Sequence, residues 1–138
     1  MSNFLYIWSM KPKTLKKETV EYLTKRLMDE YIAHTVYRSA TNYCANVGYE
    51  KAAKYYANEA EDELTHAKRI QEYLNGWNVY IAVPSIEVAP KFTSLPEIVD
   101  YVYTLEYDLL KAYEKDSYEC FEMDLPTFTF LQEFIIIQ

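Results

Sequence analysis

Residues 59–67 of the chain, Glu-Ala-Glu-Asp-Glu-Leu-Thr-His-Ala, place a glutamate and a histidine on the apolar side of an expected helix. Around them, residues that suit a buried face recur at three- and four-residue steps, the period of an amphipathic helix. The members of this series are Ala52, Tyr56, Glu59, Glu63, His66, Ile70 and Tyr73. Because Gly48 precedes the series and Asn75-Gly76 follow it, we predict a helix over residues 49–75.

The same spacing predicts three further helices, over residues 14–46, 96–122 and 125–138. Ser94 is placed to cap the third helix, and the chain restarts a helix directly after Asp124. The expected buried faces are Leu23, Leu27, His34, Tyr37 and Cys44 in the first, Val99, Val102, Glu106, Leu109, Tyr113 and Ser117 in the third, and Phe128, Leu131, Ile135 and Gln138 in the fourth.

The segment between the second and third helices, residues 76–95, shows no helical period and contains Pro84 and Pro90. A connection of this length is unusual in a small domain unless it travels the length of a bundle. We therefore predict one all-α domain, a four-helix bundle whose long crossover makes the second and third helices parallel. Residues 1–13 are expected to form an N-terminal extension.

The composition fits this fold and excludes several classes of function. Half of the 138 residues are apolar, and only two glycines and five prolines interrupt them, which favours long helices. A net charge of -7 argues against nucleic acid as a partner, because such binding rests on lysine and arginine. The apolar segment 4–8 is too short to span a membrane and lacks the order of a signal peptide, which predicts a cytoplasmic protein. Cys44 and Cys120 fall at opposite ends of the bundle and are expected to be free thiols.

Acidic residues occupy the expected buried face of three helices. Glu30 lies there in the first helix, Glu63 and His66 in the second, and Glu106 in the third. An ionised carboxylate is costly to bury unless a positive charge compensates it. Bound metal ions would compensate all of these groups, and oxygen ligands with one imidazole suit iron or manganese.

These residues also fall at one level of the bundle. Glu30 and His66 lie eighteen residues before and after the turn at Gly48. Antiparallel helices joined by a tight turn bring equal distances from it into register, at about 1.5 Å per residue. The same count from the last turn brings Glu106 and Gln138 to a common level. We predict one metal-binding layer made of Glu30, Glu63, His66, Glu106 and Gln138.

Other polar residues near this layer have different interpretations. Tyr37 is either a core tyrosine or a hydrogen-bond donor to the cluster. His34 shares the buried face, and we interpret it as a hydrogen-bonded core histidine. Glu59 and Asp62 are expected at the polar rim and not among the ligands.

With these residues in place, the chain from about Leu23 onward resembles the non-haem ferritins. The resemblance rests on Asp29-Glu30-Tyr31 with Tyr37, Glu61-Asp62-Glu63-Leu64-Thr65-His66-Ala67, Leu105-Glu106-Tyr107 and Leu125-Pro126-Thr127-Phe128-Thr129-Phe130-Leu131-Gln132, in the family's order and spacing. It implies a ferritin-like antiparallel four-helix bundle that acts as a ferroxidase and stores iron.

The resemblance also implies a role for each residue. Glu30, Glu63 and His66 would hold one iron ion, Glu63 and Glu106 a second, and Gln138 would stand beside the second ion. Tyr37 would be the tyrosine near the centre of the catalytic group. Two Fe(II) ions per subunit would be oxidised by dioxygen or peroxide, and ferric ion would pass to a mineral inside a closed cage.

The sequence departs from the family at several positions. Ferritins continue the fourth helix beyond the glutamine, whereas this sequence ends at Gln138, so the expected homo-oligomer is either a dimer or a cage. Ile137 occupies the position of an acidic third-iron ligand of bacterial ferritins, and no third site is expected. Leu109 stands where bacterioferritins need a histidine after Glu106, and the second helix has no methionine to ligate haem. We therefore expect no haem.

The alternative hypothesis is a shortened ferritin-like structural or assembly module with weak or no metal chemistry. Its apolar segments 4–8 and 134–137 would then contact neighbouring chains. A further hypothesis is a di-iron oxidase of an organic substrate, which requires a cavity beside the metals.

Overall fold

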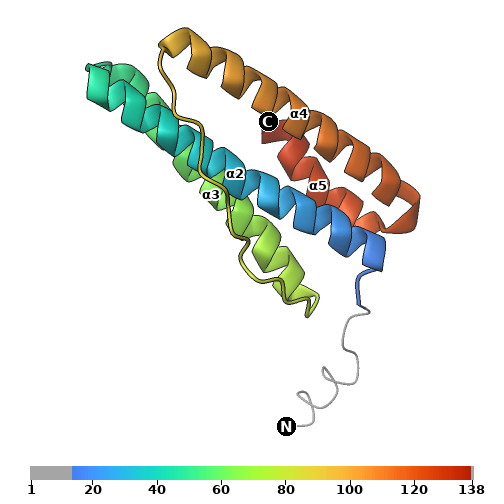
Figure 1. Cartoon of the computed structure of the whole chain (residues 1–138). Helices are drawn as coiled ribbons and strands as arrows, with labels where there is room; N and C mark the ends of the chain where they lie inside the picture. Colours follow the sequence, from blue (N-terminus) through green and yellow to red (C-terminus); the bar gives the residue numbers. More distant parts are fainter. Residues whose placement is uncertain (1–13, 138) are drawn as a thin grey trace.

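A computed structural model describes residues 14–137, which form four α-helices and no strand (Figure 1). The helices are α2 (Lys17–Val47), α3 (Glu50–Gly76), α4 (Leu95–Met123) and α5 (Leu125–Ile137). The predicted all-α bundle is confirmed, and each helix begins and ends within three residues of its expected bounds. The expected N-terminal extension and Gln138 lie outside the described residues.

A left-handed glycine ends α2 and turns the chain back on itself. Gly48 has a φ of 90°, a conformation that glycine adopts without steric cost. The amide of Tyr49 donates to the carbonyl of Cys44 at 2.8 Å, which satisfies one of the last carbonyls of the helix. α2 and α3 are therefore an antiparallel pair (Figure 1).

The segment 77–94 runs along the bundle from the end of α3 to the start of α4, so α3 and α4 are parallel as predicted (Figure 1). Phe92 of this segment is buried in the core. The hydroxyl of Ser39 donates to the carbonyl of Pro90, and that of Tyr43 donates to the carbonyl of Thr93 at 3.2 Å. These contacts hold the crossover against α2.

Ser94 caps α4, because its hydroxyl oxygen accepts a hydrogen bond from the amide of Glu97 at 3.2 Å. The Glu97 carboxylate accepts from the amide and the hydroxyl of Thr93 in return. We expect Ser94→Ala to lower the free energy of unfolding by about 1 kcal/mol in urea titrations. Ser85→Ala, in the crossover, is the matched control, and an equal loss in both variants would contradict a capping role.

Apolar side chains gather in two clusters that are separated along the bundle. One includes Leu27 and Ala67, and the other includes Val36 and Ala60. Glu30 lies between Leu27 and Val36 along α2, and Glu63 lies between Ala60 and Ala67 along α3. The expected metal layer therefore lies between two apolar cores, which shield it from bulk water at both ends.

The buried faces of α4 and α5 differ from the expected ones. Val99 is 50% exposed, and its neighbour Ile98 is buried instead. In α5, Leu131 is buried as expected, whereas the predicted Phe128 and Ile135 are only partly buried against the core, and Thr127, Phe130 and Phe134 are buried without having been predicted. Consecutive apolar residues give no period in α5, so packing against α3 and α4 selects the buried face.

Both cysteines are free and buried, and they belong to different apolar clusters, as predicted. Burial, reinforced by nearby acidic groups, raises the pKa of the Cys120 thiol to about 11. A thiol that stays protonated is a poor nucleophile, so neither cysteine marks a reactive site. Within residues 14–137, none of the helices combines the length and apolarity needed to cross a bilayer.

Candidate metal centre

Three of the predicted ligands come together inside the bundle. Glu30 from α2 and Glu63 and His66 from α3 each offer a ligand atom, and these atoms lie within 4.8 Å of one another. Nδ1 of His66 is 3.3 Å from a Glu30 oxygen and 3.4 Å from a Glu63 oxygen. The three-residue spacing puts Glu63 and His66 on one face of α3, and the turn at Gly48 brings Glu30 opposite them. Both carboxylates are buried, with Glu30 fully enclosed.

Burial disfavours the charged forms of Glu63 and His66. For His66, contacts with the two carboxylates favour the charged form and outweigh burial. Burial lowers the pKa of His66, but hydrogen bonds with Glu30 and Glu63 outweigh it and raise the pKa to about 10. Burial raises the pKa of Glu63 to about 8, which the bond to His66 opposes and the bond to Glu30 reinforces. Without a metal, protonated His66 supplies the compensating positive charge. A divalent cation would displace these protons as it binds.

The raised pKa values predict that the metal-free chain loses stability as pH rises. A group whose folded pKa is raised stabilises fully below its unfolded pKa, and this contribution disappears as pH rises through the folded value. The window runs from 4.5 to about 8 for Glu63 and from 6.5 to about 10 for His66. We expect the thermal midpoint of chelator-treated protein to fall between about pH 6 and about pH 9. A variant with Glu63→Gln and His66→Gln should show a flatter profile, and an equally steep fall would contradict the assignment.

Glu106 adjoins this group without entering it. The hydroxyl of Tyr37 donates to a Glu106 oxygen at 2.6 Å. Burial raises the pKa of Glu106, the Tyr37 bond opposes the shift, and the negative charge of Glu63 adds to it. The charge of His66 opposes the shift, so both residues influence the pKa of Glu106, which is half-buried at the edge of the cluster. Tyr37 satisfies both of its interpretations, because it is buried in the core and donates to an expected ligand.

The remaining predicted residues fall as follows. The ring of His34 donates through Nδ1 to the carbonyl of Ala60 at 2.7 Å, which confirms the expected hydrogen bond, but the residue is only partly buried. Asp62 is exposed and Glu59 is partly exposed, which agrees with their placement at the rim. Gln138 lies outside the described residues, so the fifth member of the layer stays a prediction.

Two polar contacts beside the cluster were not predicted. The hydroxyl of Tyr113 donates to the second oxygen of Glu30 at 2.6 Å. Arg26, one turn before Glu30, pairs with buried Asp116 of α4 at 2.8 Å. The sequence placed Tyr113 on the buried face of its helix but gave no sign of its partner. For the ion pair, the sequence offered only an acid in the second half of α4 and an arginine in the first half of α2, and only the fold shows that the two side chains meet.

A groove between α3 and α4 opens beside Glu106. Its volume is about 440 Å³, and its lining is rich in tyrosine, with Tyr37, Tyr55, Tyr56, Tyr103, Tyr107 and Glu106 among the lining residues. α5 has 13 residues against 29 in α4, so it lies along only part of α4 (Figure 1). This is why Val99, expected in the core, lines the open groove instead.

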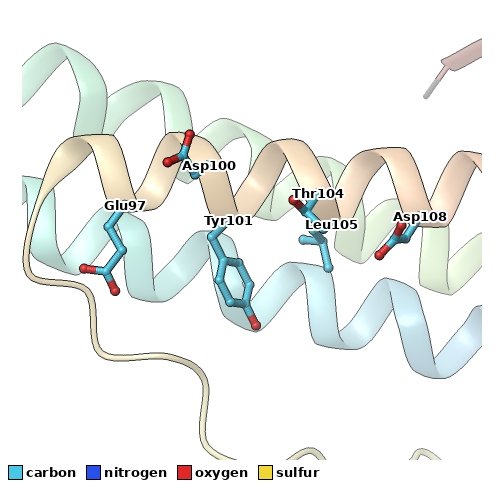
Figure 2. Close-up of a pocket in the computed structure, with 6 residues that line it drawn as sticks. All are labelled: Glu97, Asp100, Tyr101, Thr104, Leu105 and Asp108. Carbon is cyan, nitrogen blue, oxygen red and sulfur yellow. The ribbon is translucent and has the colours of Figure 1, made fainter.

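A second depression, of about 540 Å³, lies along α4, on the side where Tyr101 and Leu105 extend toward α2 (Figure 2). Glu97, Asp100 and Asp108 line it together with Tyr101, Thr104 and Leu105. Hydrogen bonds from Thr93 lower the pKa of Glu97, which is committed to the cap of α4. None of the predicted ligands lines this depression, which is a solvated acidic face.

Comparison with known proteins agrees with the fold. The family model of the ferritin-like domain matches residues 20–138, and the chain therefore belongs to the ferritin-like family. No curated protein matches it in sequence.

Solved ferritins share its architecture. The ferritin of Chlorobium tepidum is 20% identical, with a TM-score of 0.84 over 89% of this chain and 76% of that one. An open pore ferritin from the hyperthermophilic archaeon Archaeoglobus fulgidus gives 20% identity and a TM-score of 0.83, over 89% of this chain and 77% of that one. A PmFTN variant soaked in iron gives 18% identity and a TM-score of 0.82, over 88% of this chain and 79% of that one. At this identity the likeness concerns the fold.

Proposed function

We propose that the chain is a ferroxidase and iron-storage protein that takes two Fe(II) ions per subunit as its substrate. The observation that carries the proposal is the buried group of Glu30, Glu63 and His66, whose ligand atoms lie within 4.8 Å of one another. One iron ion would bind these three residues. The second would bind Glu63, Glu106 and Gln138.

The donor set suits this chemistry. Carboxylate oxygens are hard ligands that favour Fe(III) over Fe(II), so they lower the potential of the bound iron and promote its oxidation. Two Fe(II) ions give up one electron each, and dioxygen takes up the two electrons with two protons to give hydrogen peroxide. Where hydrogen peroxide is the oxidant, it takes up two electrons and two protons and gives two molecules of water. His66 and Glu63 release their protons when the metal binds, before oxidation, so the two protons of this step come from water.

The tyrosine-lined groove supplies an entry for iron and oxidant. It reaches from the surface to Glu106 and Tyr37, the edge of the proposed second iron position. The hydrogen bond from Tyr37 orients the Glu106 carboxylate at that edge. The inner position, at Glu30, is fully buried.

Anaerobic titration with Fe(II) tests the proposal, and we expect about two ions per chain followed by rapid oxidation when air is admitted. A variant with Asp100→Asn and Asp108→Asn, in the acidic depression of Figure 2, is the matched control for weak surface binding. It should still bind two ions. Binding of less than one ion by the parent chain would overturn the proposal.

We further propose a cytoplasmic homo-oligomer, a dimer or a cage, without haem. Apolar side chains exposed on the described chain support association, among them Ile136 at 82% and Tyr103 at 71% exposure. The same exposure favours the alternative function, an assembly module with weak or no metal chemistry. Sedimentation combined with the iron titration separates the two, because an assembly module would associate without binding Fe(II).

A further inference from the structure

Tyr113 of α4 is one of the most deeply buried side chains of the molecule, and its hydroxyl is committed to the metal layer. The residue is fully enclosed, and its hydroxyl donates to Oε1 of Glu30 at 2.6 Å. A hydroxyl bonded to a carboxylate at this distance forms a strong, charge-assisted hydrogen bond. Tyr113 is therefore held to Glu30, as Tyr37 is held to Glu106 on the open side of the layer.

An aromatic contact from α5 fixes the ring of Tyr113. Phe134 stacks on it with 5.0 Å between ring centroids and an interplanar angle of 12°. The same Phe134 meets the imidazole of His66 edge-on, with 6.0 Å between centroids. One side chain of α5 thus packs against both Tyr113 and His66. In a close-packed interior this contact fixes the plane of the tyrosine ring and limits the positions that its hydroxyl can take.

The two carboxylate oxygens of Glu30 have different partners. Oε1 receives the hydroxyl of Tyr113, whereas Oε2 is 3.3 Å from Nδ1 of His66. We propose that Tyr113 is a positioning residue that holds Glu30 with Oε2 toward the ion shared with Glu63 and His66. This inference rests on the proposed metal site and adds to it the binding mode of one ligand.

The consequence is a carboxylate that binds through one oxygen. A glutamate with both oxygens available can chelate one ion, bridge two or change between these modes. Glu30 is fully enclosed, so Tyr113 occupies one of its oxygens where solvent does not reach. Glu106 differs in its surroundings, because it is half-buried beside the groove, although the hydroxyl of Tyr37 occupies one of its oxygens in the same way.

Anaerobic calorimetry with Co(II), a spectroscopic stand-in for Fe(II), tests this role in the full chain. We expect Tyr113→Phe to weaken Co(II) binding about 10- to 100-fold and to shift the visible Co(II) absorption bands, which report ligand geometry. Tyr73→Phe is the matched control, because its hydroxyl also bonds across helices, to Thr127 at 2.9 Å, and its ring stacks on Phe130 of the same cluster. It should leave both readouts unchanged.

A Glu30→Gln background separates positioning from general packing. If Tyr113 acts through Glu30, adding Tyr113→Phe to Glu30→Gln changes Co(II) affinity no further. An equal loss in both backgrounds, or unchanged binding by Tyr113→Phe, would overturn the inference while leaving the metal site intact. Failure of the parent chain to bind Co(II) and Fe(II) would overturn the site and the inference together.

A second measurement needs no variant of Tyr113. Infrared difference spectra of the parent chain with and without Co(II), compared with those of Glu30→Gln, isolate the carboxylate stretches of Glu30. We expect a separation of its two stretches no smaller than that of a free carboxylate, which is the mark of binding through one oxygen while the other accepts a hydrogen bond. A narrow separation, which indicates chelation, contradicts the proposal.

Discussion

Replacing Glu63 with alanine is expected to abolish rapid Fe(II) oxidation, because this residue is the one proposed to contact both iron ions. Loss of an outer-shell partner typically costs about 10- to 100-fold, so loss of a shared ligand should slow oxidation by more than about 100-fold. The number of tightly bound Fe(II) ions should fall from two to one or none. Stopped-flow absorbance after mixing with aerated buffer measures the rate, and anaerobic titration measures the number of ions.

Glu61→Ala is the matched control, because Glu61 is an exposed acid on the same helix, two residues away. It removes the same charge without touching the buried group, and its oxidation rate should equal that of the parent. His66→Ala should resemble Glu63→Ala. If Glu63→Ala and His66→Ala both oxidise iron as fast as the parent chain, the site is wrongly assigned.

Stability distinguishes loss of function from loss of folding. Burial raises the pKa of Glu63 to about 8, so the folded chain disfavours its ionised form. An isosteric Glu63→Gln keeps the volume and removes the charge, and the metal-free variant should be at least as stable as the parent near pH 8. A variant that folds well and binds no iron would show that Glu63 is retained for its ligand atoms.

The sequence was sufficient for the fold because the deciding signals are local. Gly48 marks a turn that needs a left-handed backbone conformation, which glycine adopts easily, and the cap at Ser94 marks the start of α4. The crossover was read from its length and its prolines. Each of these features depends on a few neighbouring residues, so no tertiary information was needed to find them.

The sequence was not sufficient to define the complete buried face of α5, of which it predicted Leu131 but not Phe130 or Phe134. Six of the last eight described residues of that helix are apolar, from Phe130 to Ile137, so several faces could be buried equally well. The choice of Phe130 and Phe134 depends on the rings they meet, Tyr73 on α3 and Tyr113 on α4. Partners this distant in sequence carry no periodic signal.

The sequence predicted the metal layer only in part. Helical spacing and distance from the turn put Glu30, Glu63 and His66 at one level, and the structure brings their ligand atoms together. The same count cannot resolve a shift of a few ångströms, which leaves Glu106 at the edge. Nor does it reveal which hydroxyl meets which carboxylate, and Tyr113 was therefore missed.

Removing Arg26 is expected to produce the largest loss of stability of any single substitution considered for this chain. Its guanidinium is 2.8 Å from an oxygen of Asp116, and the two side chains are only 12% and 6% exposed. Burial raises the pKa of Asp116 to about 6, and Arg26 opposes this shift. Arg26→Met keeps the apolar bulk but leaves a buried carboxylate without its cation. Loss of one partner of such a pair costs about 3–5 kcal/mol in the free energy of unfolding.

Urea unfolding at several pH values tests this expectation. The loss should shrink as pH falls toward 5, because Asp116 then accepts a proton and the uncompensated charge disappears. The double variant with Arg26→Met and Asp116→Leu should regain most of the stability, since two apolar side chains can replace a buried ion pair. Glu114→Ala, which breaks the exposed pair with Lys111 on the same helix, is the control and should cost less than about 1 kcal/mol. A double variant as unstable as Arg26→Met alone would mean that Arg26 stabilises the bundle through contacts other than its pairing with Asp116.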